Sequence, residues 1–240
     1  MTLRGQRVKH GRVPVLTELI TVTTADGVEL DGALYAAQSL SWPRARLLMV
    51  HGLTWNFYRG PSRWLPTLLA KTGYECLSMN MRDHDLPHPK DFELAHHDLW
   101  ACIDYLWQRP GGPLVLLGHG YGCNKLVCYP GISGDSRPHH YILTTLGGVK
   151  SYRPDLWTEV LRLAPKMDGR VLIVQGAVDP NVEIRERADE LSSAATNARV
   201  DVTMLDGGNH YFDGRHSELG RTVTDWLSRA LGEAPGGTDA

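Results

Sequence analysis

The sequence predicts a single α/β domain in which a mostly parallel central sheet of about eight strands carries helices on both faces. Short apolar segments alternate with amphipathic segments of helical period, a pattern typical of parallel strands connected by helices. The chain opens instead with a hairpin, because the Asp-Gly turn signal at residues 25–27 separates two segments of strand composition. With 240 residues, of which 42% are hydrophobic, the chain is long enough to bury one large core.

The predicted elements follow from composition and period, taken in chain order. The opening hairpin strands and the β-branched or leucine-rich apolar runs give expected strands over residues 19–24, 28–36, 46–50, 74–81, 114–117, 141–146, 171–175 and 199–205. Apolar residues at helical spacing, such as Trp64, Leu65, Leu68 and Leu69 in the first case, give expected helices over 61–71, 92–107, 121–129, 155–163, 182–194 and 217–231. We assign one domain to residues 1–231 and expect a disordered tail over 232–240, which is rich in Gly, Pro and Asp.

Composition limits the classes of partner. A formal net charge of −2 provides no long-range attraction to nucleic acid or to an anionic membrane, so we expect a small-molecule substrate, no nucleic acid and no membrane partner. The four cysteines form no C-x-x-C pair and fall in predicted buried elements, which favours reduced thiols and a cytoplasmic location. The first eleven residues lack the apolar stretch of a signal peptide. The sequence does not indicate an oligomeric state.

The most informative motif is Gly118-His119-Gly120-Tyr121-Gly122, which follows an apolar run. It matches G-x-S-x-G, the sharp strand-to-helix turn, called the nucleophile elbow, that presents a nucleophilic serine. Here Gly120 stands where the serine would be. A covalent acyl-enzyme needs an oxygen or a sulfur at that point, and glycine has neither. The turn requires a positive φ at its central residue, so glycine there also relieves backbone strain.

Three further motifs follow other predicted strands. His51-Gly52-Leu53 comes after the first buried strand, Asp179 after the strand over 171–175, and His210 after the strand over 199–205. With these motifs in this order, the chain resembles the α/β-hydrolase superfamily over nearly its whole length. Residues 51–58 resemble the small, nearly capless esterases and dienelactone-hydrolase-like members, and the short segment 149–170 leaves room for only a minimal cap.

The resemblance implies a role for each matching position. Asp179 would orient His210, His210 would act as general base, and the backbone N–H groups of Leu53 and Tyr121 would form an oxyanion hole beside Gly120. No metal or other cofactor is implied. The expected substrate pocket further includes His51, Thr54, Trp55, His119, Asp83 and His84, the last two being equally compatible with a solvated loop.

Other sites are weaker alternatives. Gly118-x-Gly120-x-x-Cys123 lacks the third glycine of a dinucleotide-binding turn, and no acidic residue for a ribose ends the next strand. Cys123, one turn into the helix, is expected to pack in the core rather than to replace the missing nucleophile. Histidines near residues 84–88 and the pairs at 96–97 and 139–140 show no known metal-ligand spacing.

Three functional hypotheses remain open. In the first, the enzyme uses the His210/Asp179 dyad and the oxyanion donors on a small ester, lactone or thioester without a covalent serine, for hydrolysis, elimination, decarboxylation or cyclisation. In the second, the chain is a serine esterase or thioesterase inactivated by replacement of its elbow serine. In the third, it is a pseudoenzyme that binds a ligand or a partner. We adopt the first as the working hypothesis.

Overall fold

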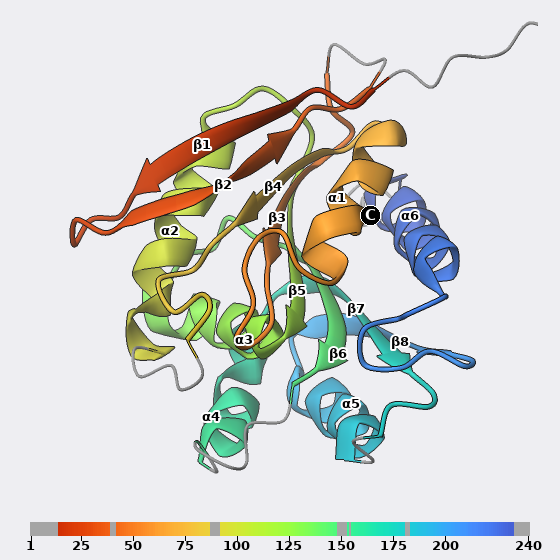
Figure 1. Cartoon of the computed structure of the whole chain (residues 1–240). Helices are drawn as coiled ribbons and strands as arrows, with labels where there is room; N and C mark the ends of the chain where they lie inside the picture. The colour runs from red at the N-terminus through yellow and green to blue at the C-terminus, as the bar shows by residue number, and fades with distance from the viewer. Residues whose placement is uncertain are drawn as a thin grey trace, which may run out of the picture.

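Eight strands form one sheet at the centre of the molecule (Figure 1). In chain order they are β1 (Thr17–Thr23), β2 (Glu29–Tyr35), β3 (Arg46–Val50), β4 (Glu75–Met79), β5 (Leu114–Gly120), β6 (His140–Leu146), β7 (Gly169–Gly176) and β8 (Ala198–Leu205). Their order across the sheet is β1-β2-β4-β3-β5-β6-β7-β8. The computed structural model describes residues 14–38, 42–86, 92–147, 153, 155–180 and 183–232. Neighbours from β4 to β8 pair in parallel, while β1 and β2 add an antiparallel edge, so the predicted fold class is confirmed.

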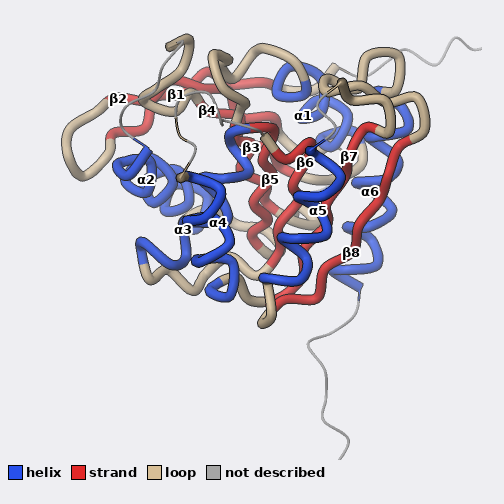
Figure 2. The backbone as a smooth tube through the Cα atoms, turned by 90° about the horizontal axis from the view of Figure 1, so that it is seen from below, coloured by secondary structure: helices blue, strands red, loops and turns tan. Residues whose placement is uncertain are grey.

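Helices cover both faces of this sheet (Figure 2). They are α1 (Pro61–Lys71), α2 (Ala95–Trp107), α3 (Tyr121–Ser133), α4 (Leu156–Leu163), α5 (Glu183–Ala194) and α6 (His216–Gly232), with short 3₁₀ turns η1 (Phe92–Leu94) and η2 (Ala164–Lys166). The cores on the two faces follow from strand alternation. In β3, Leu47 and Met49 pack with α1 and α6, whereas Leu48 and Val50 pack on the face covered by α2, α3, α4 and α5.

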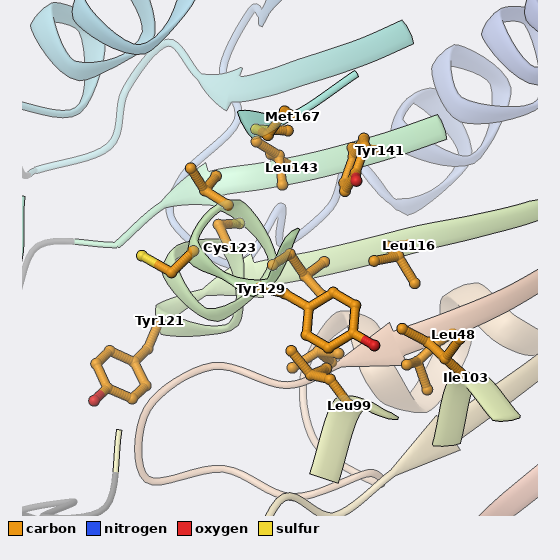
Figure 3. Close-up of a cluster of buried hydrophobic side chains, with 14 of the residues drawn as sticks. Leu48, Leu99, Ile103, Leu116, Tyr121, Cys123, Tyr129, Tyr141, Leu143 and Met167 are labelled. Atoms are coloured by element: carbon orange, nitrogen blue, oxygen red, sulfur yellow. The ribbon is translucent and has the colours of Figure 1, made fainter. Parts of the chain in front are cut away.

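The larger core surrounds α3, the helix that follows the glycine motif. Figure 3 shows Cys123 and Tyr129 of this helix among leucines of the sheet and of α2. The nine residues of α3 from Tyr121 to Tyr129 are all buried, including the polar Asn124 and Lys125, so this part of the helix is enclosed on every side. The start of α3 is therefore held in place by packing.

Most element boundaries agree with the sequence prediction to within two residues, and three differences matter. Strand β5 continues to Gly120 instead of ending at residue 117, because Gly120 still pairs with Leu146. Residues 92–94 form a 3₁₀ turn rather than the first turn of α2. Helix α3 extends to Ser133 and ends at Gly134, whose φ of 71° fits the left-handed C-cap. Gly232 ends α6, and the rest of the predicted tail lies outside the described residues.

A buried ion pair joins α3 to the loop that follows β4. Lys125 Nζ lies 2.5 Å from Asp83 Oδ1, and the two side chains are 1% and 5% exposed. Beside it, the buried carboxylate of Asp98 accepts hydrogen bonds from the backbone and the guanidinium of Arg82, which also binds Asp26 in the β1–β2 turn. These contacts connect the hairpin, the β4 loop and α2. Within the described ranges, no helix combines the length and the apolar composition needed to cross a lipid bilayer.

Replacing Lys125 by methionine should lower the free energy of unfolding by about 3–5 kcal/mol, because it leaves the Asp83 carboxylate buried without its counter-charge. The double variant Lys125→Met/Asp83→Leu should recover much of this loss, since it removes both charges. Urea unfolding followed by circular dichroism measures the difference. A single variant as stable as the wild type would contradict the prediction.

Candidate active site

The site lies at the carboxyl ends of the parallel strands, where the chain direction across the sheet reverses between β3 and β5. From β3 the chain continues to β4 on one side of the sheet, and from β5 it continues to β6 on the other side. The connections after β3 and β5 therefore diverge and leave a crevice between them. The segment 52–55 enters it from β3, Gly120 from β5 and His210 from the loop after β8, and Asp179 in the loop after β7 binds His210. Four segments distant in sequence therefore meet at one point.

Gly120 forms the sharp turn between β5 and α3 with a φ of 56°. A Cβ atom placed on it would lie 3.6 Å from Gly52 Cα and 3.8 Å from His210 Nε2, both ordinary van der Waals distances. The surroundings therefore admit a side chain at position 120, and only the backbone conformation favours glycine. An oxygen bonded to that carbon would come within hydrogen-bonding distance of His210 Nε2.

The two outer glycines of the motif have a different reason to be glycine. A Cβ on Gly118 would lie 2.9 Å from the backbone nitrogen of Cys123, and one on Gly122 would lie 2.6 Å from the carbonyl oxygen of Val50. A real Cβ atom does not come this close to backbone atoms, so any side chain at either position would force the backbone to shift. Gly118 and Gly122 thus allow α3 to pack directly against β5 and β3, whereas Gly120 is not required for packing.

His210 and Asp179 form a hydrogen-bonded pair. His210 Nδ1 lies 2.8 Å from Asp179 Oδ2, and the carboxylate side chain is 3% exposed while the imidazole is 27% exposed. Because a carboxylate only accepts, the proton of the neutral ring is on Nδ1, and Nε2 carries the lone pair. That lone pair is on the nitrogen that faces position 120. The sequence assigned both residues, and the structure brings them together.

The turn after β3 has its central peptide fixed from two sides. His51 Nε2 accepts the N–H of Met81 at 3.0 Å, so His51 donates its Nδ1 proton to the carbonyl oxygen of Gly52 at 2.8 Å. The same carbonyl also accepts the N–H of Trp55. Burial, followed by the charge of Lys125, lowers the pKa of His51 to about 4, so the ring remains neutral near pH 7. The Gly52–Leu53 peptide, whose N–H is the expected oxyanion donor, is thereby held in one orientation.

A cavity of about 230 Å³ lies over this junction. Its lining contains Gly52, Leu53, Thr54, Trp55, His119, Gly120, Tyr121, Gly147, His210 and Tyr211. Both expected oxyanion residues and the expected pocket residues Thr54, Trp55 and His119 are therefore part of it. Gly147 and Tyr211 line it as well and were not predicted, although a glycine at a strand end and an aromatic residue next to the expected base are signals that the sequence contains.

Three expected pocket residues do not line this cavity, which corrects the sequence interpretation. Both ring nitrogens of His51 bind backbone groups, as described above. Asp83 is turned toward α3 by Lys125, and His84 Nδ1 bonds to the carbonyl oxygen of Met81. Each of the three side chains is thus engaged with its own structural partners.

One wall of the cavity is an aromatic stack. The indole of Trp55 stacks on His119 with ring centroids 5.2 Å apart and lies against Tyr211 at 4.9 Å. The indole also lies close to Gly60, where an added Cβ would be 1.9 Å from the ring. Gly60 has a φ of 53°, so both conformation and close contact require glycine there.

His119 is buried at the base of this wall with a defined tautomer. Thr144 donates its hydroxyl proton to the carbonyl oxygen of Gly118, so it accepts the Nδ1 proton of His119 at 3.1 Å. Burial, reinforced by neighbouring His210, lowers the pKa of His119 to about 3. Its ring therefore stays neutral and adds no charge next to His210 at neutral pH.

The alternatives to the dyad find little support in the described residues. Cys123 is fully buried, its thiol faces the carbonyl oxygen of Thr144, and burial raises its pKa far above the usual range, so it is not an available thiolate. Among residues with a described placement, no group of three or more His, Cys, Asp or Glu is arranged to hold a metal ion. His88, named in the sequence analysis, lies outside the described residues.

No family model matches the sequence, and no curated protein is recognisably similar to it in sequence. Solved structures, by contrast, resemble it in fold. Dienelactone hydrolase from Anabaena variabilis ATCC 29413 superimposes with a TM-score of 0.74 at 15% identity, covering 91% of this chain and 100% of that one. Est1E from Butyrivibrio proteoclasticus gives 0.73 at 15% identity over 90% and 99% of the two chains.

The esterase Pf2001 of Pyrococcus furiosus gives a TM-score of 0.68 at 16% identity, covering 95% of this chain and 100% of that one. The similarity to all three extends over nearly the whole length of each chain. At such low identity it establishes the architecture and leaves the chemistry to the site itself. The eight-stranded, mostly parallel sheet and its helices thus have the α/β-hydrolase fold.

Proposed function

We propose that this protein hydrolyses a small ester, lactone or thioester by direct attack of water, with His210 as general base and no covalent intermediate. The observation that carries the proposal is the position of His210: its Nδ1 is bonded to Asp179 at 2.8 Å, and its Nε2 is 3.8 Å from the place of a Cβ on Gly120. The lone pair of the base is therefore directed at the point where a nucleophilic oxygen would lie.

In this mechanism a named residue assists each chemical step. Water beside Gly120 attacks the carbonyl carbon and gives a proton to His210 Nε2, while Asp179 stabilises the imidazolium that forms. The carbonyl oxygen becomes an oxyanion that accepts the N–H groups of Leu53 and Tyr121. When the tetrahedral intermediate collapses, the bond from the carbonyl carbon to the leaving oxygen of an ester or lactone, or to the leaving sulfur of a thioester, breaks, and His210 returns its proton to that departing atom. Water is consumed; an ester gives an acid and an alcohol, a thioester an acid and a thiol, and a lactone one hydroxy acid.

Backbone strain around the site favours an active enzyme over a binding protein that has lost its chemistry. Of the described non-glycine residues with positive φ, Thr54 lines the cavity, Thr145 bonds to His210, and Phe212 follows His210 by two positions. The fourth, Asp85, donates its N–H to the carbonyl oxygen of Trp55. Such conformations cost of order 1–3 kcal/mol each and cluster where a function requires them.

The second candidate is a serine esterase whose elbow serine has been replaced by glycine. The ordinary contacts of a Cβ at position 120 are the observation that favours it, since the side chain of a serine would fit there without a clash. Under this candidate the same dyad would activate a serine hydroxyl. Ferulic acid has been bound to the structural neighbour Est1E, so small aromatic esters are sensible substrates for testing both candidates.

Placing serine at position 120 should create or restore covalent esterase activity, because the base, its carboxylate and the oxyanion donors are already arranged. Gly120→Ser should turn over p-nitrophenyl acetate with a burst and react with a fluorophosphonate probe. Gly120→Ala, which adds the carbon without the hydroxyl, is the matched control and should do neither. A folded serine variant without burst or label would refute the proposed geometry.

In the chain with Gly120, hydrolysis of activated esters should depend on the dyad and not on the cysteine. His210→Ala should abolish it and Asp179→Asn should reduce kcat by orders of magnitude, because the amide releases the wrong imidazole tautomer. Cys123→Ala should retain nearly full kcat/KM. The hypothesis fails if the cysteine variant is the inactive one while His210→Ala keeps most of its rate.

Any side chain at position 120 should lower stability, since it must adopt the φ that glycine adopts freely. Urea unfolding should show a loss of about 1–3 kcal/mol for both Gly120→Ala and Gly120→Ser. Gly232→Ala is the control, because that glycine ends α6 in open space without a positive φ and should change stability by about 0.5 kcal/mol or less. Equal stability of the wild type and Gly120→Ala would show that the turn is not strained.

A further inference from the structure

Strand β6 contains an irregularity directly beside the elbow. Its pairing with β5 passes from His119 opposite Thr144 to Gly120 opposite Leu146, so Thr145 has no partner across the ladder. An unpaired residue of this kind is a β-bulge, and bulges next to active sites redirect a side chain. Here the redirected side chain is that of Thr145, which is completely buried.

The bulge requires an unfavourable backbone conformation, and hydrogen bonds to both neighbouring strands stabilise it. Thr145 has a φ of 53°, which is unfavourable for a β-branched residue. The N–H of Leu146 is accepted by the side chain of Gln175 on β7 at 3.1 Å, and the N–H of Gly147 by the carbonyl oxygen of Gly120. Backbone groups displaced by the bulge are thus satisfied, so the surroundings determine this conformation.

The redirected hydroxyl reaches the loop of the general base. Thr145 Oγ1 donates to the main-chain carbonyl oxygen of His210 at 3.1 Å. The neighbouring amides of Tyr211 and Asp213 donate instead to the side chain of Asn209 in the same loop, and these bonds do not fix the loop relative to the sheet. The bond from Thr145 does, because it connects His210 to β6, next to Gly120.

We propose that Thr145 is a positioning residue for His210: the bulge turns its hydroxyl onto the main chain of the base and holds the imidazole over Gly120. The inference rests on the proposed role of His210 as base. Asp179 holds the ring at Nδ1 and Thr145 holds the backbone of the same residue, so the direction of Nε2 is fixed at two points. Displacing a catalytic group by about 1 Å costs roughly 100-fold in rate, so a single hydrogen bond at this position affects the reaction.

Two matched substitutions separate the hydroxyl from the shape of the side chain. Thr145→Val keeps the branched shape and removes the donor, whereas Thr145→Ser keeps the donor. In the Gly120→Ser background, fluorophosphonate labelling should slow by about 10- to 100-fold with valine and by no more than about threefold with serine. Thr145→Gly lacks the hydroxyl but adopts a positive φ freely. It should react with the fluorophosphonate as slowly as Thr145→Val while being no less stable to urea than Thr145→Val.

A second measurement needs neither substrate nor nucleophile. In ¹⁵N-labelled protein that retains Gly120, the imidazole signals of His210 should show one tautomer, protonated on Nδ1, both without a further substitution and in Thr145→Ser. Thr145→Val should show a mixture of tautomers, because the ring is no longer held against Asp179. Denaturation curves establish that each variant is folded at the temperature used.

The outcomes distinguish the two proposals. If Gly120→Ser is not labelled, the proposed function fails, and the tautomer comparison alone decides the role of Thr145. If Gly120→Ser is labelled, and the valine and serine variants at position 145 react at the same rate with the same tautomer, the role of Thr145 is overturned. Slow labelling by Thr145→Val that Thr145→Ser restores supports it.

Discussion

The close approach of the first turn of α3 to the end of β3 is the contact on which the rest of the site depends. Gly122 allows it, because any Cβ there would collide with the carbonyl oxygens of Val50 and His51. This approach places the N-terminus of α3 beside the turn that carries Leu53, so Leu53 and Tyr121, from different elements, line one cavity. A larger residue at position 122 would separate the elbow from that turn and disperse the site, whatever side chains it carried.

Around this contact, the neighbours of each titratable group determine its charge and its hydrogen bonds. Buried His51 and His119 are kept neutral and bound to neighbouring hydrogen-bonding groups, and Lys125 is neutralised by Asp83. His210 differs because its outer nitrogen faces a cavity while its inner one is held by a carboxylate. Among the histidines close to the crevice, it is therefore the one whose surroundings suit proton transfer.

The sequence predicted the architecture well, because strand and helix periods alternate clearly and the order of the four motifs restricts the topology. It also singled out Asp179 and His210, which the structure joins by a hydrogen bond. It did not predict that β5 continues through the motif, since that depends on pairing with β6 across the bulge. The bulge itself arises from contacts with Gln175 and Gly120, which no local pattern encodes. His51 was misplaced for the same reason, because its ring is occupied by the distant amide of Met81.

The indole of Trp55 illustrates how a single glycine affects molecular recognition. Gly60 lets the ring approach the backbone closely, and His119 and Tyr211 contact the ring as well, so these three neighbours restrict its position before any ligand binds. The conformational entropy of this large side chain is therefore lost when the chain folds and not when a ligand arrives. A ligand therefore binds to a preorganised pocket wall. Its affinity depends on shape complementarity and on the release of solvent, without an entropic cost for ordering this side chain.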